Sequence, residues 1–142
     1  MRRFVKQWWP VILWMGVIFI GSSISNVPRV GGKTTDGLAH RVAHIVEFAV
    51  LGVLTLRAMS QGRRVTKRDL LITLIVVTLY GASDEFHQRF TPGRNSEGAT
   101  VLFDLAGGAV GAWVYRQWTL RQRSSVSSPK HAGKTVAERK SN

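Results

Sequence analysis

Four long apolar stretches, separated by shorter polar segments, dominate the pattern of hydrophobic and polar positions along this chain. The first lies between Lys6 and Arg29, where no residue carries a formal charge, and it is long enough to cross a bilayer as a helix. The other three are shorter than the roughly 20 apolar residues that a membrane helix needs, so each must include polar residues at its ends to cross. They are Val42–Leu56, Leu70–Ser83 and Gly98–Tyr115. The pattern predicts an all-α integral membrane four-helix bundle with spans at about 8–25, 40–58, 69–88 and 97–117.

Two other interpretations of the same pattern remain open. The shorter stretches could be buried helices of a soluble protein, although none shows the polar stripe that a soluble surface helix presents. The first stretch could be a cleaved signal peptide, because basic residues precede it and the small residues Gly21–Ser25 follow it, although it is longer than the usual apolar region of such a peptide. If it is retained as a span, we expect Pro10 in the first turn of its helix, where proline is tolerated.

The end of the chain differs in composition from the rest. Residues 124–142 are rich in serine, lysine and small side chains and contain little that could be buried. Such a segment cannot offset the entropy lost on folding. We therefore expect one domain over residues 1–123 and a disordered, basic, cytoplasmic tail over residues 124–142.

Charge is distributed unevenly around the apolar stretches. The chain has 20 Lys+Arg against 8 Asp+Glu, a formal net charge of +12, and such a balance would suit nucleic acid. Most of the basic residues, however, belong to the N-terminus, the tail, and the loop between the second and third spans, where we expect Arg63 to be solvated. The positive-inside rule then predicts a multi-pass protein of the cell membrane with both termini in the cytoplasm, and no nucleic acid partner is needed. The absence of cysteine excludes disulfides and thiolate ligands.

A dense polar segment, Asp84–Arg94, follows the third apolar stretch. Polar side chains at the end of an apolar helix are costly unless they have partners or a task. Asp84, Glu85 and His87 could act as acid and base groups, or they could form ion pairs that satisfy buried charges. Gln88 lies four residues after Asp84, on the same face of a helix. Pro92-Gly93 fits a type II turn that would present Arg94 as a cation for these acids or for an anionic ligand.

A second group of polar residues lies on the second predicted helix. His40, His44 and Glu47 are spaced so that they share one face. Two histidines four residues apart can bind a metal, but the H-E-x-x-H pattern is absent, so we expect no metal and no cofactor. The favoured interpretation is a hydrogen-bonded face that fixes this helix to its neighbour.

The fourth predicted helix contains Asp104 among apolar residues. An acid inside a membrane span marks a functional site by default. Gly107 and Gly111 follow at a spacing that allows another helix to approach closely. We expect Glu85, His87 and Arg94 to form one coupled polar unit with His44, Glu47 and Asp104 from the neighbouring helices, because convergence reduces the cost of charges at that depth.

These residues resemble the motifs of the VanZ-like family of small membrane proteins. The most specific match is Asp84-Glu85, His87-Gln88, Phe90 and Pro92-Gly93-Arg94, within a resemblance that covers roughly residues 8–118. The flanking motifs are Arg41, His44, Leu51 and Gly52 in the second stretch and Asp104, Gly107 and Gly111 in the fourth. The chain departs from the family at Phe48, where a tyrosine is usual, and at Thr100, where an acid is common. The resemblance implies a role in the cell envelope, since the founding member of the family is associated with low-level teicoplanin resistance.

Three functions are compatible with the sequence. The first is binding or shielding of an anionic lipid-linked or cell-wall component, with effects on glycopeptide (teicoplanin) susceptibility; the partners would be membrane lipids and a lipid-linked cell-wall precursor or the glycopeptide. The second is a membrane-embedded enzyme acting on a lipid-linked substrate, with Asp84, Glu85 and His87 as the catalytic candidates. The third is a component of a transporter or channel. Binding is favoured because the chain has no nucleophile motif and no P-loop. The predicted binding residues are Arg41, His44, Glu47, Asp84, Glu85, His87, Gln88, Arg94 and Asp104.

Overall fold

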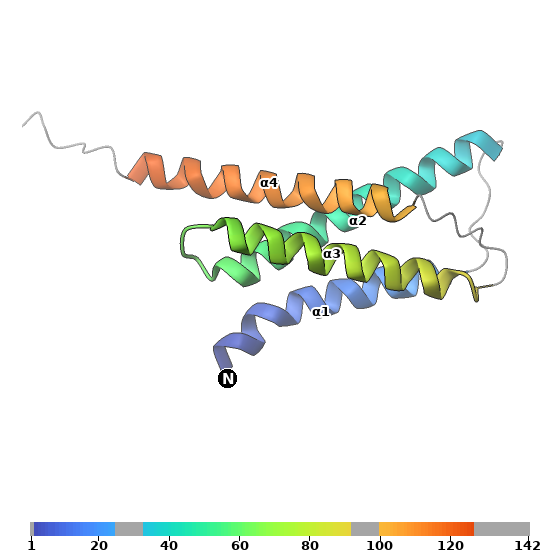
Figure 1. Cartoon of the computed structure of the whole chain (residues 1–142), viewed down its shortest axis with the longest axis horizontal. Helices are drawn as coiled ribbons and strands as arrows, with labels where there is room; N and C mark the ends of the chain where they lie inside the picture. The colour runs from blue at the N-terminus through green and yellow to red at the C-terminus, as the bar shows by residue number, and fades with distance from the viewer. Residues whose placement is uncertain (1, 25–32, 92–99, 127–142) are drawn as a thin grey trace, which may run out of the picture.

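Four helices make up the bundle. The computed structural model describes residues 2–24, 33–91 and 100–126. Its elements are α1 (Arg2–Ser23), α2 (Lys33–Ser60), α3 (Lys67–Gln88) and α4 (Thr100–Val126), and the described residues contain no strand. Figure 1 shows that consecutive helices run in opposite directions along one long axis. Helices α2 and α4 are therefore parallel to each other and antiparallel to α1 and α3. The predicted all-α membrane bundle is confirmed.

Helix α2 is the centre of the arrangement because it contacts each of the other three helices. Helix α3 contacts both α1 and α4, whereas α1 and α4 do not contact each other within the described residues. The buried apolar core follows this arrangement, with members from α1, α2 and α3. They are Val11, Ile18, Phe48, Leu51, Ala58 and Val77.

The turn between α2 and α3 is defined by local sequence. Helix α2 ends where Gln61 and Gly62 adopt φ values of 50° and 77°, the left-handed conformation that commonly terminates helices. Helix α3 begins with Thr66 as its N-cap, and its first turn carries Asp69. The Thr66 hydroxyl accepts from the Asp69 backbone N–H at 3.2 Å, and the Asp69 carboxylate accepts from the Thr66 N–H at 2.8 Å, which completes a capping box.

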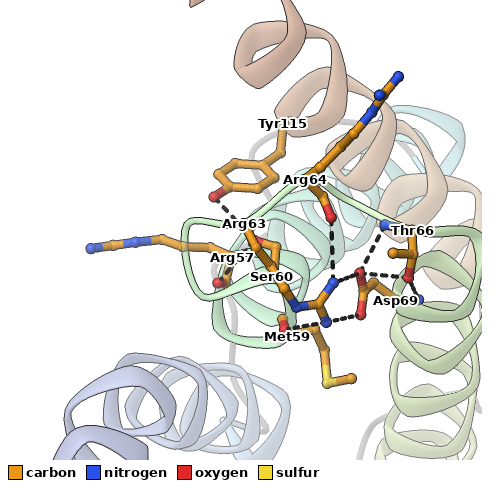
Figure 2. A network of polar contacts seen from close by, with 8 residues as sticks. All are labelled: Arg57, Met59, Ser60, Arg63, Arg64, Thr66, Asp69 and Tyr115. Atoms are coloured by element: carbon orange, nitrogen blue, oxygen red, sulfur yellow. Dashed lines mark hydrogen bonds and ion pairs between the residues drawn. The ribbon is translucent and has the colours of Figure 1, made fainter. Parts of the chain in front are cut away.

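Arg63 lies exposed in the loop, as expected, but it also forms an ion pair that the sequence did not predict. Its guanidinium forms two hydrogen bonds to the Asp69 carboxylate, at 2.6 and 2.7 Å, and further bonds to the carbonyls of Met59 and Arg64 (Figure 2). Asp69 is buried, with 2% of its surface exposed, and it therefore requires a cation that the sequence pattern did not assign. The same carboxylate raises the pKa of the Arg63 guanidinium. The loop is thus fastened to the first turn of α3.

The position of Pro10 and the start of the C-terminal tail differ from those expected. Helix α1 begins at Arg2, so Pro10 lies inside the helix rather than in its first turn. Proline has no N–H, so the Lys6 carbonyl loses the hydrogen bond it would otherwise receive. Helix α4 continues to Val126, into the segment expected to be disordered. Residues 127–142 lie outside the described part of the chain.

Close packing between α2 and α4 depends on glycine, as predicted for Gly107 and Gly111. A Cβ at Gly107 would overlap the Ile45 carbonyl, and a Cβ at Gly111 would overlap the Ala49 carbonyl. Gly52 on α2 lies against the backbone of Gly108 in the same way. The two parallel helices therefore meet backbone to backbone, which only residues without a side chain permit.

The outer surface of the bundle has the character of a surface that faces lipid. Large apolar side chains are exposed on every helix, among them Ile12, Val46, Leu79 and Leu102. Soluble monomers rarely expose so much contiguous apolar surface. By length and composition, three of the described helices could cross a membrane, over Phe4–Ser23, Arg41–Ser60 and Lys67–Gln88.

Candidate functional site

At one end of the bundle α1 and α3 end and α2 and α4 begin (Figure 1). Buried polar side chains gather at this end. Five of them have at most 4% of their surface exposed. We call this set the polar cluster: His44, Asp84, Glu85, Gln88 and Asp104. Because three helices contribute to it, the cluster forms only when α2, α3 and α4 have packed.

A histidine–carboxylate pair links α2 to α4 within this cluster. The His44 imidazole donates from Nδ1 to Asp104 Oδ1 at 2.9 Å, and both side chains are almost completely buried. Asp104 in turn lies against α3, since a Cβ at Gly81 would come within 2.9 Å of Asp104 Oδ2. The intramembrane acid predicted from the sequence therefore has a histidine partner and lies where three helices meet.

Helix α3 supplies the other side of the cluster. Gln88 donates from Nε2 to Asp84 Oδ2 at 2.8 Å, as their spacing of four residues predicted. The second oxygen of that carboxylate, Oδ1, is buried and has no hydrogen-bond partner among the described residues. Glu85 is buried beside Asp84, although adjacent residues point about 100° apart on a helix. Both acids belong to the buried face of α3, which runs from Asp69 to Gln88.

His87 lies apart from the carboxylates with which it was expected to couple. Its Nε2 shares a hydrogen bond of 3.1 Å with the Ser23 hydroxyl at the end of α1. Its ring also lies 4.3 Å, between centroids, from that of Phe19. On a helix, residue 87 faces about 60° away from residue 84, and that difference turns His87 toward α1. His87 thus fixes α1 to α3 at the edge of the polar cluster.

Of the two arginines predicted for the site, the structure describes Arg41. Arg41 is exposed on α2, and its guanidinium carbon lies 5.6 Å from the centre of the Phe103 ring on α4, a cation–π contact. Arg94 and the Pro92-Gly93 turn lie outside the described residues, and so does the side chain of His40. Glu47 is half-buried on α2. The structure thus brings His44 and Asp104 together, and Asp84 and Gln88 together, with Glu47 and Glu85 nearby in the fold.

The arrangement of these motif residues can be compared with known proteins. The VanZ/LLP1 family model matches residues 7–121, which include the whole polar cluster and most of all four helices. The chain belongs to the VanZ-like family. No curated protein and no solved structure shows significant similarity to it. The family membership and the apolar helices together make it a membrane protein.

Two aromatic residues that the sequence did not assign to the polar cluster connect the helices next to it. The Tyr80 hydroxyl donates to the Met15 carbonyl at 2.5 Å, and the Trp14 indole N–H donates to the Glu47 carbonyl at 2.8 Å. Both bonds tie α1 to the rest of the bundle beneath the cluster. The sequence did contain a signal for Tyr80, because it precedes Asp84 and Gln88 at intervals of four residues on the same face.

The two departures from the VanZ-like pattern have different positions. Phe48 is fully buried, with its ring 6.1 Å from that of His44 and 6.0 Å from that of Tyr80, measured between centroids. An apolar ring therefore fills the space next to the histidine, and the nearby phenol is that of Tyr80 on α3. Thr100 is half-buried at the first position of α4, one turn before Asp104. Phe48 is consequently part of the packing of the cluster, whereas Thr100 lies at its rim.

Proposed function

We propose that this VanZ-like protein binds a lipid-linked or cell-wall component at the polar cluster and thereby lowers the susceptibility of the cell to teicoplanin. The observation that supports binding is the buried carboxylate of Asp84. One of its oxygens accepts from Gln88, and the other, Oδ1, has no partner among the described residues. A buried acceptor without a partner is costly, and a donor on a ligand would remove that cost.

The chemistry of the site favours a head group with two kinds of polar group. Hydroxyl or amine donors would bind Asp84, and a negative charge would bind the exposed guanidinium of Arg41 on α2. Lipid-linked precursors of the cell wall combine both features. A purely anionic ligand would be repelled by Asp84, Glu85 and Asp104, so the donor groups are an essential part of the proposal.

The orientation of the protein is part of the same proposal. Both termini lie in the cytoplasm, because the basic residues gather near the N-terminus, in the α2–α3 loop and at the end of α4. The polar cluster then opens toward the outer surface of the membrane. Teicoplanin and assembled wall precursors are present on that side of the membrane, where the proposed function needs them.

A second candidate function is catalysis on a lipid-linked substrate. The observation that favours it is the buried His44–Asp104 pair, in which a carboxylate orients an imidazole at 2.9 Å. His44 would then be the base and Asp104 the orienting acid. In that case His44, rather than His87, is the essential histidine.

The binding proposal is tested by two matched substitutions in α3. Asp84→Asn keeps an oxygen that can accept from Gln88 but removes the negative charge, whereas Asp69→Asn changes a buried acid at the opposite end of the same helix. At equal amounts of protein in the membrane, we expect Asp84→Asn to return teicoplanin susceptibility to that of cells lacking the protein. Cells with Asp69→Asn should remain protected. If the wild-type protein gives no protection, or if both variants lose it equally at equal abundance, the proposal is wrong.

The catalytic alternative is tested with the purified protein and a lipid extract from the envelope. Catalysis predicts a product that forms with the wild type and with His87→Ala but not with His44→Ala. Binding alone predicts that a lipid is retained by the wild type, released by Asp84→Asn, and recovered without chemical change.

A further inference from the structure

A second feature lies at the other end of the bundle, far from the polar cluster. A groove of about 670 Å³ opens between α1 and α4 and has α2 as its floor. It exists because α1 and α4 do not contact each other within the described residues. Its size is within the range of about 300–1,000 Å³ that is usual for ligand sites.

The walls of the groove are apolar and its mouth is cationic. Val53 on α2 and Val114 on α4 line the interior, and Trp118 and Tyr115 of α4 line the wall nearer the helix end. Lys6 of α1 and Arg57 of α2 also line the groove, and both side chains are exposed. Neither forms an ion pair with a carboxylate of the described residues. Figure 2 shows Arg57 extending away from the Arg63–Asp69 pair rather than toward that acid.

The position of the groove along the helices matches a membrane interface. Lys6 lies in the second turn of α1, and Arg57 lies in the last turn of α2, so both mark the same end of the bundle. Trp118 and Tyr115 have rings 6.0 Å apart between centroids, and such aromatic residues concentrate at the level of lipid head groups. Apolar walls therefore extend from this level toward the middle of the membrane.

We propose that this groove binds one anionic glycerophospholipid from the leaflet nearer the N-terminus. The phosphate lies between Lys6 and Arg57, and an acyl chain lies along Val53 and Val114. The charge complementarity selects an anionic over a zwitterionic head group, because the two cations at the mouth have no acidic partner within the part of the chain that the structure describes. The apolar walls require a lipid rather than a free phosphate ion.

The experiment is native mass spectrometry of the full chain in detergent, titrated with phosphatidylglycerol or with phosphatidylcholine of the same acyl composition. The wild type should retain one phosphatidylglycerol in preference to phosphatidylcholine, and glycerol phosphate alone should not bind. A cation near an anionic lipid surface raises the binding affinity by a factor of roughly five. The double variant Lys6→Gln/Arg57→Gln should therefore weaken phosphatidylglycerol binding by about thirtyfold. The matched control is Lys67→Gln/Arg68→Gln, which removes two charges from the same end of the bundle but outside the groove, and which should bind as the wild type does.

A second measurement on the folded wild type does not depend on those variants. Phosphatidylglycerol brominated on its acyl chains should quench tryptophan fluorescence more than brominated phosphatidylcholine does, and Trp118→Phe should remove that difference. Equal binding of the two lipids by the wild type would overturn the proposal, as would an equal loss in the control variant. A dimer of the chain that excludes lipid from the groove would also overturn it.

Discussion

The glycine contacts between α2 and α4 make a prediction about stability that can be tested with one substitution at two positions. Gly111→Ala places a methyl group where the Ala49 carbonyl lies, whereas Gly16→Ala on α1 places one where no atom lies within 4 Å. Both positions are inside helices. The chemical change is therefore the same, and only the surroundings differ.

The expected magnitudes follow from this difference. Alanine is better than glycine in a helix by about 0.5–1 kcal/mol, so Gly16→Ala should be neutral or stabilising by up to that amount. At Gly111 the neighbour is backbone, which cannot rotate away, and the helices would have to separate by about 1.5 Å to restore ordinary contact. Overpacking of this kind typically costs about 1–3 kcal/mol, which exceeds the gain in helix propensity. We therefore expect Gly111→Ala to be destabilising by about 1–2 kcal/mol.

The assay is thermal unfolding of both variants in the same detergent, followed by circular dichroism and by loss of the monomer peak in size-exclusion chromatography. Gly111→Ala should unfold at a lower temperature than the wild type, and Gly16→Ala at the same or a higher temperature. The reasoning is refuted if both variants shift in the same direction by the same amount. Such a result would mean that α2 and α4 do not pack through their backbones.

Three further predictions concern the ion pairs and the orientation. A double-mutant cycle between Arg63 and Asp69 should give a larger coupling energy than is usual for exposed ion pairs, because the contact is bidentate and Asp69 is buried, and additive effects would show that this contact contributes nothing. Asp104→Ala should be destabilising by about 3–5 kcal/mol because it leaves His44 buried without its acceptor, whereas Asp104→Asn should cost clearly less; equal losses in unfolding experiments would argue against the hydrogen bond. A reporter fused to the C-terminus should be active only in the cytoplasm, and external activity would reverse the proposed orientation.

Much of the architecture could be predicted because membrane helices follow simple rules of length and composition. The four apolar stretches gave four helices, and the spacing of Gly107 and Gly111 predicted their packing. The errors lie at the helix ends. Pro10 was placed in a first turn because the apolar stretch begins near it, but the helix extends through the basic residues that precede it. Arg63 is exposed as predicted, but its pairing with Asp69, six residues later, was missed because the sequence alone does not show that Asp69 is buried.

The sequence named the residues of the polar cluster as candidates, but it did not predict all of the hydrogen bonds between them. Spacing along one helix was sufficient for the Asp84–Gln88 bond, since both residues share a face. The His44–Asp104 bond joins residues 60 positions apart, and no periodicity within either helix specifies it. The contact of His87 with Ser23 could not be predicted for the same reason, because it depends on where α1 packs.

The motifs on α2 and α4 act together, because the glycine contacts position the His44–Asp104 pair. Helices α2 and α4 are parallel (Figure 1), and Gly107 lies against the carbonyl of Ile45 while Gly111 lies against that of Ala49. These two contacts fix the register of the two helices. That register places Asp104, one turn before Gly107, beside His44, which immediately precedes Ile45. A larger residue at either glycine would separate the helices and lengthen a buried bond of 2.9 Å beyond the range of hydrogen bonding. The glycines therefore contribute to the site indirectly, by fixing the distance at which an acid and a histidine meet inside the helix bundle.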